Sequence, residues 1–181
     1  MEVTKLELSG LLRIRPKVFR DDRGWFFEPY NEARYLAAGV TDRFVQDNHS
    51  RSSYGTLRGL HYQAVPGQAK LVRVATGRIL DVVADIRVGS STFGRWVAVE
   101  LDAEKHEQLY IPVGFAHGFC VLSEAAEVLY KVSTLYDGSQ ERTIAWNDPE
   151  LGVKWPVEDP VLSERDRNGE SLASYRARMC R

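Results

Sequence analysis

Four histidines are the side chains of this 181-residue chain best suited to proton transfer or metal binding. They are His49, His61, His106 and His117. A metal-binding β-barrel usually carries two histidines two residues apart on one strand, because alternation then sends both imidazoles inward. Neither an HxH nor an HxxxH pattern occurs in the sequence. We therefore expect no metal site. We also expect no other cofactor, which agrees with the absence of a GxGxxG motif.

Two of the histidines lie in distinctive segments. His61 is part of RGLHYQ (residues 58–63), where a half-buried strand histidine is the simplest alternative to a catalytic one. His117 is part of GFAHGF (residues 114–119), where the glycines allow a close approach of backbone or ligand. His49 and His106 have polar neighbours, so we expect both at the surface.

Arg58 and His61 are three residues apart, so a straight strand would direct them to opposite faces. They can serve one site only if the strand kinks or bulges. Gly59 is the natural position for that irregularity. The sequence therefore predicts a distorted strand at Gly59, whereas a regular strand would exclude Arg58 from the site.

These residues must be held by a fold made mainly of strands. A period of two runs through the middle of the chain, in segments that Gly and Pro separate. The segments are 70–74, 79–88, 96–101, 109–111 and 128–134. Many short strands with regular turns favour a sandwich or barrel, and we expect one domain over residues 1–181. Asp81 and Asp85 share a strand face and could be site residues or exposed, and the pattern leaves that open.

Helices are expected only at the flanks. Asn31 could cap a helix through Glu32–Ala38 that ends at Gly39, and a C-terminal helical segment is expected over about 163–176. The turn-rich stretch 146–160 is expected to wrap the surface as an ordered loop.

Composition excludes several classes of partner. Twenty-four basic and 25 acidic residues leave a net charge of −1, which gives no long-range attraction to nucleic acid or membrane. Cys120 and Cys180 form no CxxC pair and are expected to be reduced thiols. No signal peptide pattern and no apolar stretch of ~18 residues is present, so we expect a cytoplasmic protein.

Nine segments resemble one enzyme family in order and spacing. They are DRGWFFE (22–28), RGLHYQ (58–63), QAKLVRV (68–74), DVVADIR (81–87), STFGRW (91–96), IPVGFAHGF (111–119), LYK (129–131), WNDP (146–149) and LSERD (162–166). Together they closely resemble the dTDP-4-dehydrorhamnose 3,5-epimerase family over nearly the whole chain. The resemblance implies a jelly-roll barrel of the cupin type that holds no metal and works as a homodimer.

The resemblance also implies catalytic roles. His61 is similar to the family's catalytic base and Asp166 to the carboxylate that pairs with it. Tyr130 is similar to the acid on the opposite face, and Lys70 to the lysine that stabilises the enolate. Without the resemblance, the positions of these residues have simpler explanations. Asp166 could close a helix N-terminus after Ser163, Tyr130 could be a core residue and Lys70 could be a solvated strand residue.

Substrate contacts are implied at nine further positions. These are Arg23, Glu28, Gln46, Asn48, Arg58, His117, Tyr136, Glu141 and Arg165. The N-terminal segment of about 1–50 is expected to help form the dimer and the nucleotide site, with Arg23 and Glu28 reaching the neighbouring subunit. Arg165 occupies a position where the family is expected to carry lysine, and a planar fork there replaces a point donor.

The residue types suit inversion of a carbon beside a ketone. A histidine with a pKa of ~6.5 can accept the proton, and a tyrosine with a pKa of ~10 can donate one from the other side. Together with this chemistry, the resemblance implies epimerisation at C3 and C5 of dTDP-4-dehydro-6-deoxy-D-glucose to dTDP-4-dehydro-L-rhamnose. The motifs leave open an epimerase of a single carbon that serves secondary metabolism. A nucleotide-sugar 3,4-ketoisomerase is a more distant alternative, and a non-catalytic nucleotide-sugar binding cupin belongs to a different class.

Overall fold

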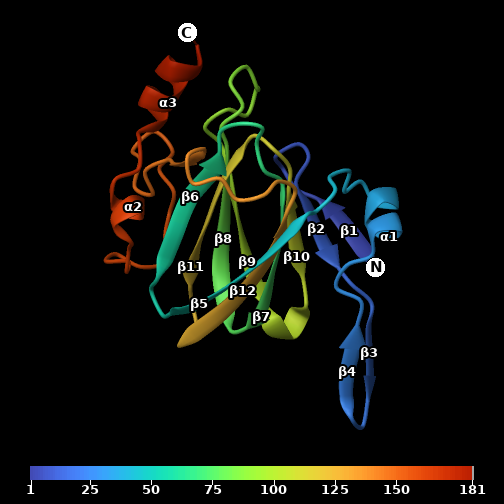
Figure 1. Cartoon of the computed structure of the whole chain (residues 1–181). Helices are drawn as coiled ribbons and strands as arrows, with labels where there is room; N and C mark the ends of the chain where they lie inside the picture. The colour runs from blue at the N-terminus through green and yellow to red at the C-terminus, as the bar shows by residue number, and fades with distance from the viewer. Residues whose placement is uncertain (181) are drawn as a thin grey trace.

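Two antiparallel sheets face each other in the computed structural model, which describes residues 1–180 (Figure 1). The six-stranded sheet has the order β1 (Glu2–Lys5), β2 (Leu12–Arg15), β10 (Gln108–Ile111), β7 (Lys70–Thr76), β12 (Ala125–Val132) and β5 (Gln46–Ser53). The five-stranded sheet has the order β13 (Glu141–Thr143), β6 (Leu57–Gln63), β11 (Phe115–Val121), β8 (Arg78–Asp85) and β9 (Trp96–Asp102). The predicted mainly-β jelly roll is confirmed.

Alternation along the strands decides which side chains face the interior. On β8, Ile79 and Val83 belong to an apolar cluster with Val72 and Val128 of the other sheet, while Val82 and Ala84 pack on the outer side. Complete burial of such an aliphatic side chain stabilises the fold by roughly 1.5–3 kcal/mol. The inner cluster therefore fixes the register of both sheets, and with it the direction of every polar residue on the same faces.

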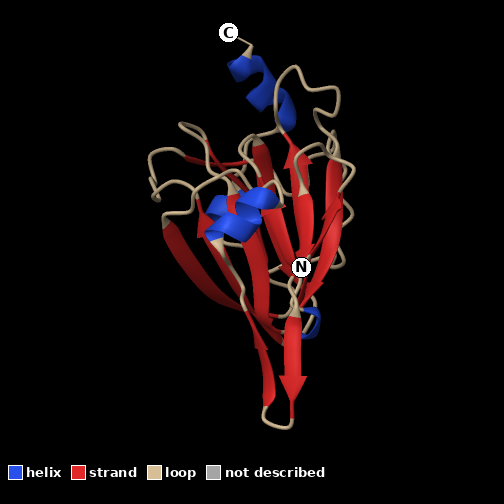
Figure 2. Ribbon diagram, turned by 90° about the vertical axis from the view of Figure 1, so that its right-hand side faces the viewer, coloured by secondary structure: helices blue, strands red, loops and turns tan. Residues whose placement is uncertain are grey.

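The outer faces are covered by the flanking segments. Leu60, Val82 and Ala84 of the five-stranded sheet pack against Leu172 and Tyr175 of the C-terminal segment. On the six-stranded sheet, Leu71 and Tyr110 share an apolar cluster with Tyr35 of α1 (Glu32–Ala37) and with Val40. Figure 2 shows the helices and strands of this arrangement. Both sheets are thus buried on two sides where the flanking segments cover them.

The flanking helices are short and capped. Asn31 caps α1, which ends near Gly39 as predicted. The predicted C-terminal helix is interrupted: α2 (Glu164–Arg167) and α3 (Leu172–Met179) are separate, and Ser163 and Ser171 cap them. The interruption arises because Glu170 pairs with Ile144 as an isolated bridge, which draws the chain into extended conformation. Among residues 1–180, no helix is long and apolar enough to cross a membrane.

The end of β8, a separate hairpin and the loop 146–160 complete the fold. The strand predicted over 79–88 ends at Asp85, because the Asp85 carboxylate accepts hydrogen bonds from Arg87, Ser90 and Thr92 and turns the chain. A separate hairpin, β3 (Val18–Asp21) and β4 (Gly24–Phe27), extends beyond the sheets at one end (Figures 1 and 2). The stretch 146–160 is an ordered, turn-rich loop, in which the Trp155 indole donates to the Trp146 carbonyl at 2.8 Å.

Candidate active site

Strand β6 is distorted where the sequence predicts it. Its register with β11 shifts between His117 and Phe119, and Gly59 has a φ of +124°. A Cβ at Gly59 would lie 2.5 Å from the Gly118 Cα, so the two backbones approach more closely than any side chain allows. Arg58 is exposed; it donates from Nε to the Ser52 hydroxyl at 3.0 Å, and it lies close enough to the site for its charge to act on the Tyr130 phenol.

His61 is held by a carboxylate. Its Nε2 lies 2.6 Å from Asp166 Oδ1, which also accepts the Gly59 amide at 3.1 Å. The Asp166 side chain is 3% exposed and the His61 ring 23%, so the pair is anchored inside while the imidazole stays accessible. The ionised carboxylate holds a proton on Nε2 and leaves Nδ1 of the neutral ring as a base.

Asp166 combines the two alternatives that the sequence offers: it lies in the capped first turn of α2, and it pairs with His61. The Ser163 hydroxyl caps α2 by accepting the Asp166 amide at 3.2 Å, and it donates to Asp166 Oδ2 at 2.6 Å. Burial would raise the pKa of the Asp166 carboxyl, but the hydrogen bonds from His61 and Ser163 outweigh it and the pKa is lowered. The carboxylate therefore stays ionised beside the imidazole.

A second histidine–carboxylate pair lies next to the first. His117 is opposite His61 across the β6–β11 ladder, and its Nε2 lies 2.9 Å from Asp81 Oδ2. The His117 side chain is 7% exposed and that of Asp81 0%. Burial lowers the pKa of His117, and the charges of Lys70 and His61 add to that effect while Asp81 opposes it.

The opposite sheet contributes a lysine and a phenol. Lys70 and Tyr130 lie on the inner faces of β7 and β12, where Tyr130 pairs with Val72 and packs against the inner apolar cluster. Burial lowers the pKa of Lys70 to about 8, although Glu141 and Asp81 favour its charge. Burial and then Glu141 raise the pKa of Tyr130, so the phenol remains protonated at neutral pH.

Polar residues at the edge of the site form a connected chain. Gln46 donates to Asn48 at 2.8 Å and accepts the Tyr136 amide at 3.0 Å. The Tyr136 hydroxyl donates to Glu141 Oε2 at 2.9 Å, and Arg165 forms an ion pair with the same oxygen. Five predicted contact residues thus meet at one edge of the site.

Arg23 and Glu28 are the predicted site residues that lie elsewhere. Arg23 is on the projecting hairpin, where it pairs with Asp21 at 2.6 Å, and its side chain is 90% exposed. Glu28 follows the hairpin and pairs with Arg34. Neither contacts the His61 region of its own chain within residues 1–180, and their predicted function in a neighbouring subunit remains a prediction.

The remaining histidines do not form a metal centre. His49 is at the surface beside Glu127, as predicted. The surface prediction for His106 is wrong, because the aromatic rings of Trp25 and Phe27 cover it at centroid distances of 4.5 and 4.8 Å. Within residues 1–180, no group of three His, Cys, Asp or Glu side chains could hold a metal ion.

The partner of His117 could not be predicted from the sequence. Asp81 and Asp85 occupy equivalent positions on one strand face, but Asp81 meets His117 while Asp85 secures the turn after β8. Both are aspartates on the same face of one strand, so the sequence contains no signal that tells which of them meets His117. The contact of Ser52 with Arg58 was also not foreseen.

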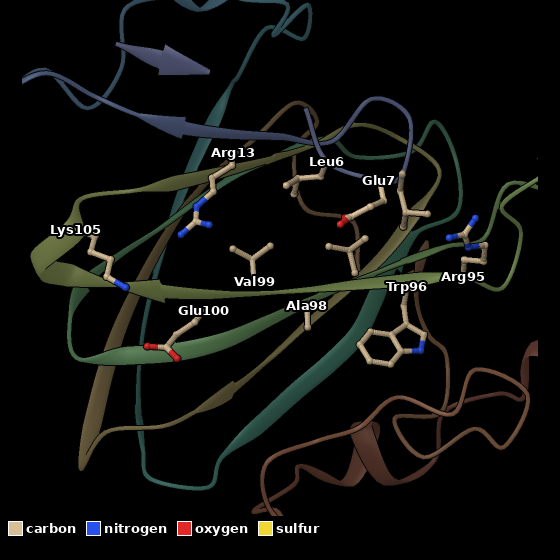
Figure 3. Close-up of a pocket in the computed structure, with 11 residues that line it drawn as sticks. Leu6, Glu7, Arg13, Arg95, Trp96, Ala98, Val99, Glu100 and Lys105 are labelled. Carbon is tan, nitrogen blue, oxygen red and sulfur yellow. The ribbon is translucent and has the colours of Figure 1, made fainter. Parts of the chain in front are cut away.

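A groove of about 650 Å³ lies away from these side chains (Figure 3). Leu6 and Glu7 border it on one side and Trp96 to Glu100 of β9 on the other. It contains no predicted site residue, and its walls combine apolar groups with mixed charges. Its size therefore does not make it the site of the chemistry.

Comparison with known proteins gives the same family by sequence and by structure. The sequence model of the family described as dTDP-4-dehydrorhamnose 3,5-epimerase matches residues 5–174. A protein of that description from Pseudomonas aeruginosa is 53% identical, over 96% of this chain and 97% of that protein. A 3,5-epimerase from Legionella pneumophila, crystallised with dTDP-4-keto-L-rhamnose, has a TM-score of 0.92 at 46% identity and covers 95% of this chain and 93% of its own. A 3'-monoepimerase from Streptomyces bikiniensis, crystallised with dTDP-quinovose, has a TM-score of 0.89 at 36% identity, over 97% of this chain and 89% of its own.

Proposed function

The chain belongs to the dTDP-4-dehydrorhamnose 3,5-epimerase family, and from this premise we propose that it is an isomerase acting on a dTDP-linked 4-keto-6-deoxy sugar. Its reaction is epimerisation at C3 and C5 of dTDP-4-dehydro-6-deoxy-D-glucose, which yields dTDP-4-dehydro-L-rhamnose. The observation that carries the proposal is the His61–Asp166 pair on one sheet, with Lys70 and Tyr130 on the inner face of the other.

His61 removes the proton from the carbon beside the ketone. Asp166 fixes the ring tautomer and stabilises the imidazolium that forms, since its carboxylate is ionised and lies at 2.6 Å. A positioned base of this kind typically contributes ~10²–10⁴-fold to the rate.

Lys70 stabilises the enolate, and Tyr130 donates its own phenolic proton to the carbon while the abstracted proton stays on His61. Removing the proton places negative charge on the ketone oxygen, where a preorganised cation contributes a further ~10²–10³-fold. Inversion requires that the new proton arrive from the face opposite the base. Tyr130 meets that requirement because it is protonated and extends from the sheet that faces β6.

Substrate binding is assigned to the polar edge and to a second subunit. Arg58 and Arg165 are cations suited to a diphosphate, and Gln46, Asn48 and Tyr136 are suited to the nucleoside and sugar. We assign His117 to a sugar contact. The protein acts as a homodimer in which the hairpin with Arg23, followed by Glu28, completes the partner's site.

The decisive experiment is incubation with the 4-keto sugar nucleotide in D₂O. Deuterium at both C3 and C5 of the product, followed by NMR, is the expected result. Label at one carbon alone would support the second candidate, a mono-epimerase, which the likeness to the Streptomyces bikiniensis 3'-monoepimerase favours.

A His61→Ala variant separates enzyme from binding protein. It is expected to bind dTDP with unchanged affinity and to incorporate no deuterium. If the wild-type protein binds the sugar nucleotide but exchanges no hydrogen, the protein is a non-catalytic nucleotide-sugar binder and the proposal fails.

A further inference from the structure

Asp81 is a buried carboxylate for which the proposed mechanism has no use. It lies in the middle of β8, and its side chain is 0% exposed. Its Oδ2 accepts from His117, while Oδ1 is buried without a hydrogen-bond partner among residues 1–180. An ionised group in the interior is costly unless charges and hydrogen bonds offset the cost. A carboxylate in this position therefore calls for an explanation.

The surroundings of Asp81 supply one. On the inner face it is diagonal to His117 of β11, because His117 pairs with Val83 and Phe119 with Asp81. Lys70 lies on the inner face of the facing sheet, and the charge of Asp81 favours its ammonium. The carboxylate thus has a histidine as its hydrogen-bond donor and a lysine as its counter-charge, and both are assigned to the substrate by the proposed function.

We propose that Asp81 is a positioning residue of the active site, which fixes the tautomer of His117 and keeps the ammonium of Lys70 charged. This inference rests on the proposed function. A carboxylate only accepts hydrogen bonds, so the contact at 2.9 Å places the ring proton on Nε2 and makes Nδ1 an acceptor. The His61–Asp166 pair follows the same logic, and the two pairs lie side by side through the pairing of His61 with His117.

The charges around Lys70 give a reason for a carboxylate at position 81. Asp81 of β8 and Glu141 of β13 favour the ammonium, and burial opposes it. His117 of β11 adds no positive charge as long as it is neutral, which its burial and the neighbouring Lys70 and His61 promote. Tyr130 of β12 is a protonated phenol. Removal of Asp81 therefore removes one of two negative charges that hold Lys70 in its active form.

An Asp81→Asn variant tests the proposal, with Asp85→Asn as its matched control. Both residues are fully buried on the same face of β8, but Asp85 contacts Arg87, Ser90 and Thr92 instead of the site. An amide can donate as well as accept, so Asp81→Asn leaves the His117 tautomer unfixed. We expect kcat for deuterium incorporation to fall about 10²-fold with little change in KM. The alkaline limb of the pH profile is expected to move to lower pH by about one unit.

Asp85→Asn is expected to lower the melting temperature and to leave kcat and the pH profile within about twofold of wild type. An Asp81→Asn variant with a wild-type pH profile and kcat would overturn the proposal, and so would equal effects of the two substitutions. Wild-type deuterium incorporation is measured first, since its absence would refute the proposed function rather than this inference.

A measurement on the unmodified protein covers the case in which the variant does not fold. Nitrogen-15 NMR of the histidine rings at pH 7 reports which nitrogen carries the proton. We expect His117 to be neutral and protonated on Nε2. A ring protonated on Nδ1, or on both nitrogens, would contradict the proposal whatever the activity of the variants.

Discussion

At the scale of single residues, Tyr130 and His61 reach the interior from different sheets, so their contributions can be separated. In Tyr130→Phe, His61 can still remove a proton and return it on the same face. We expect deuterium to enter the substrate while inverted product forms ~10²–10⁴-fold more slowly, as mass spectrometry and NMR would measure. Tyr62→Phe, which loses a hydroxyl on the outer face beside Glu170, should keep full turnover. Unchanged inversion in Tyr130→Phe would exclude Tyr130 as the acid.

Lys70 predicts the alkaline limit of activity. Burial lowers its pKa to about 8, so the ammonium that stabilises the enolate is lost as the pH rises through that value. On the alkaline side of the pH profile, we expect kcat to be constant up to about pH 8 and to fall above it. Lys70→Arg should reduce kcat, because the geometry changes, and should abolish the fall near pH 8, because guanidinium stays charged. If wild type and Lys70→Arg have the same alkaline limb in their pH profiles, the titrating group is not Lys70.

At the scale of elements, Ser163 connects a helix cap to the catalytic pair. Ser163→Ala removes the cap of α2, at a cost of about 1 kcal/mol, and the hydroxyl that donates to Asp166. The pKa of Asp166 is lowered in the fold, so its contribution to stability is present above the unfolded pKa and is lost as the pH falls through the folded pKa. We expect a rise in that pKa, a smaller stability advantage at neutral pH and a kcat reduced roughly threefold to tenfold.

Ser171→Ala is the control for this experiment. Ser171 caps α3 in the same manner, through the Ser174 amide at 3.1 Å, but contacts no catalytic residue. Urea unfolding at neutral pH should show a loss of about 1 kcal/mol for Ser171→Ala and a larger one for Ser163→Ala, while kcat falls only in Ser163→Ala. Equal kcat in the two variants would mean that the Ser163 hydroxyl does not act on Asp166.

Gly59 is the second element-scale test, because the bulge of β6 depends on it. A methyl group there would overlap the Gly118 Cα and the His117 carbonyl, at 2.5 and 2.7 Å, and would be strained at a φ of +124°. Gly59→Ala should destabilise the protein by roughly 2–5 kcal/mol and displace His61. Gly89→Ala shares the positive φ, at +89°, but meets nothing within 4 Å, and should cost about 1–2 kcal/mol with normal activity. Similar losses in the two variants would contradict a packing role for Gly59.

How far the sequence predicts these elements depends on how local their causes are. The inward and outward faces of β8 follow from alternation, and the bulge at Gly59 follows from the conflict between Arg58 and His61. The end of β8 was not predictable, because the Asp85 carboxylate overrides a continuing apolar pattern. Nor was the contact of Asp81 with His117, since it depends on which strands are neighbours, and alternation carries no information about strand order.

At the scale of the whole molecule, the contacts within a single chain do not account for the exposed aromatic residues of the hairpin of β3 and β4. Phe19, Trp25 and Phe26 are 54%, 55% and 70% exposed on it, beside Arg23. Clustered exposed aromatic residues with an arginine are typical of a protein interface or a ligand contact. The proposed dimer gives them a function, because the hairpin extends away from its own sheets and could reach another copy (Figure 1).

Subunit complementation tests this arrangement directly. His61→Ala inactivates the site of the chain that carries it, whereas Arg23→Ala should inactivate the site of the partner. Mixed after reversible dissociation, the two variants form about half heterodimers, and each heterodimer has one site with both defects and one intact site. The mixture should therefore recover about a quarter of wild-type activity, although each variant alone is nearly inactive. If Arg23 instead served its own subunit, every site in the heterodimer would carry one defect, and mixing would restore nothing.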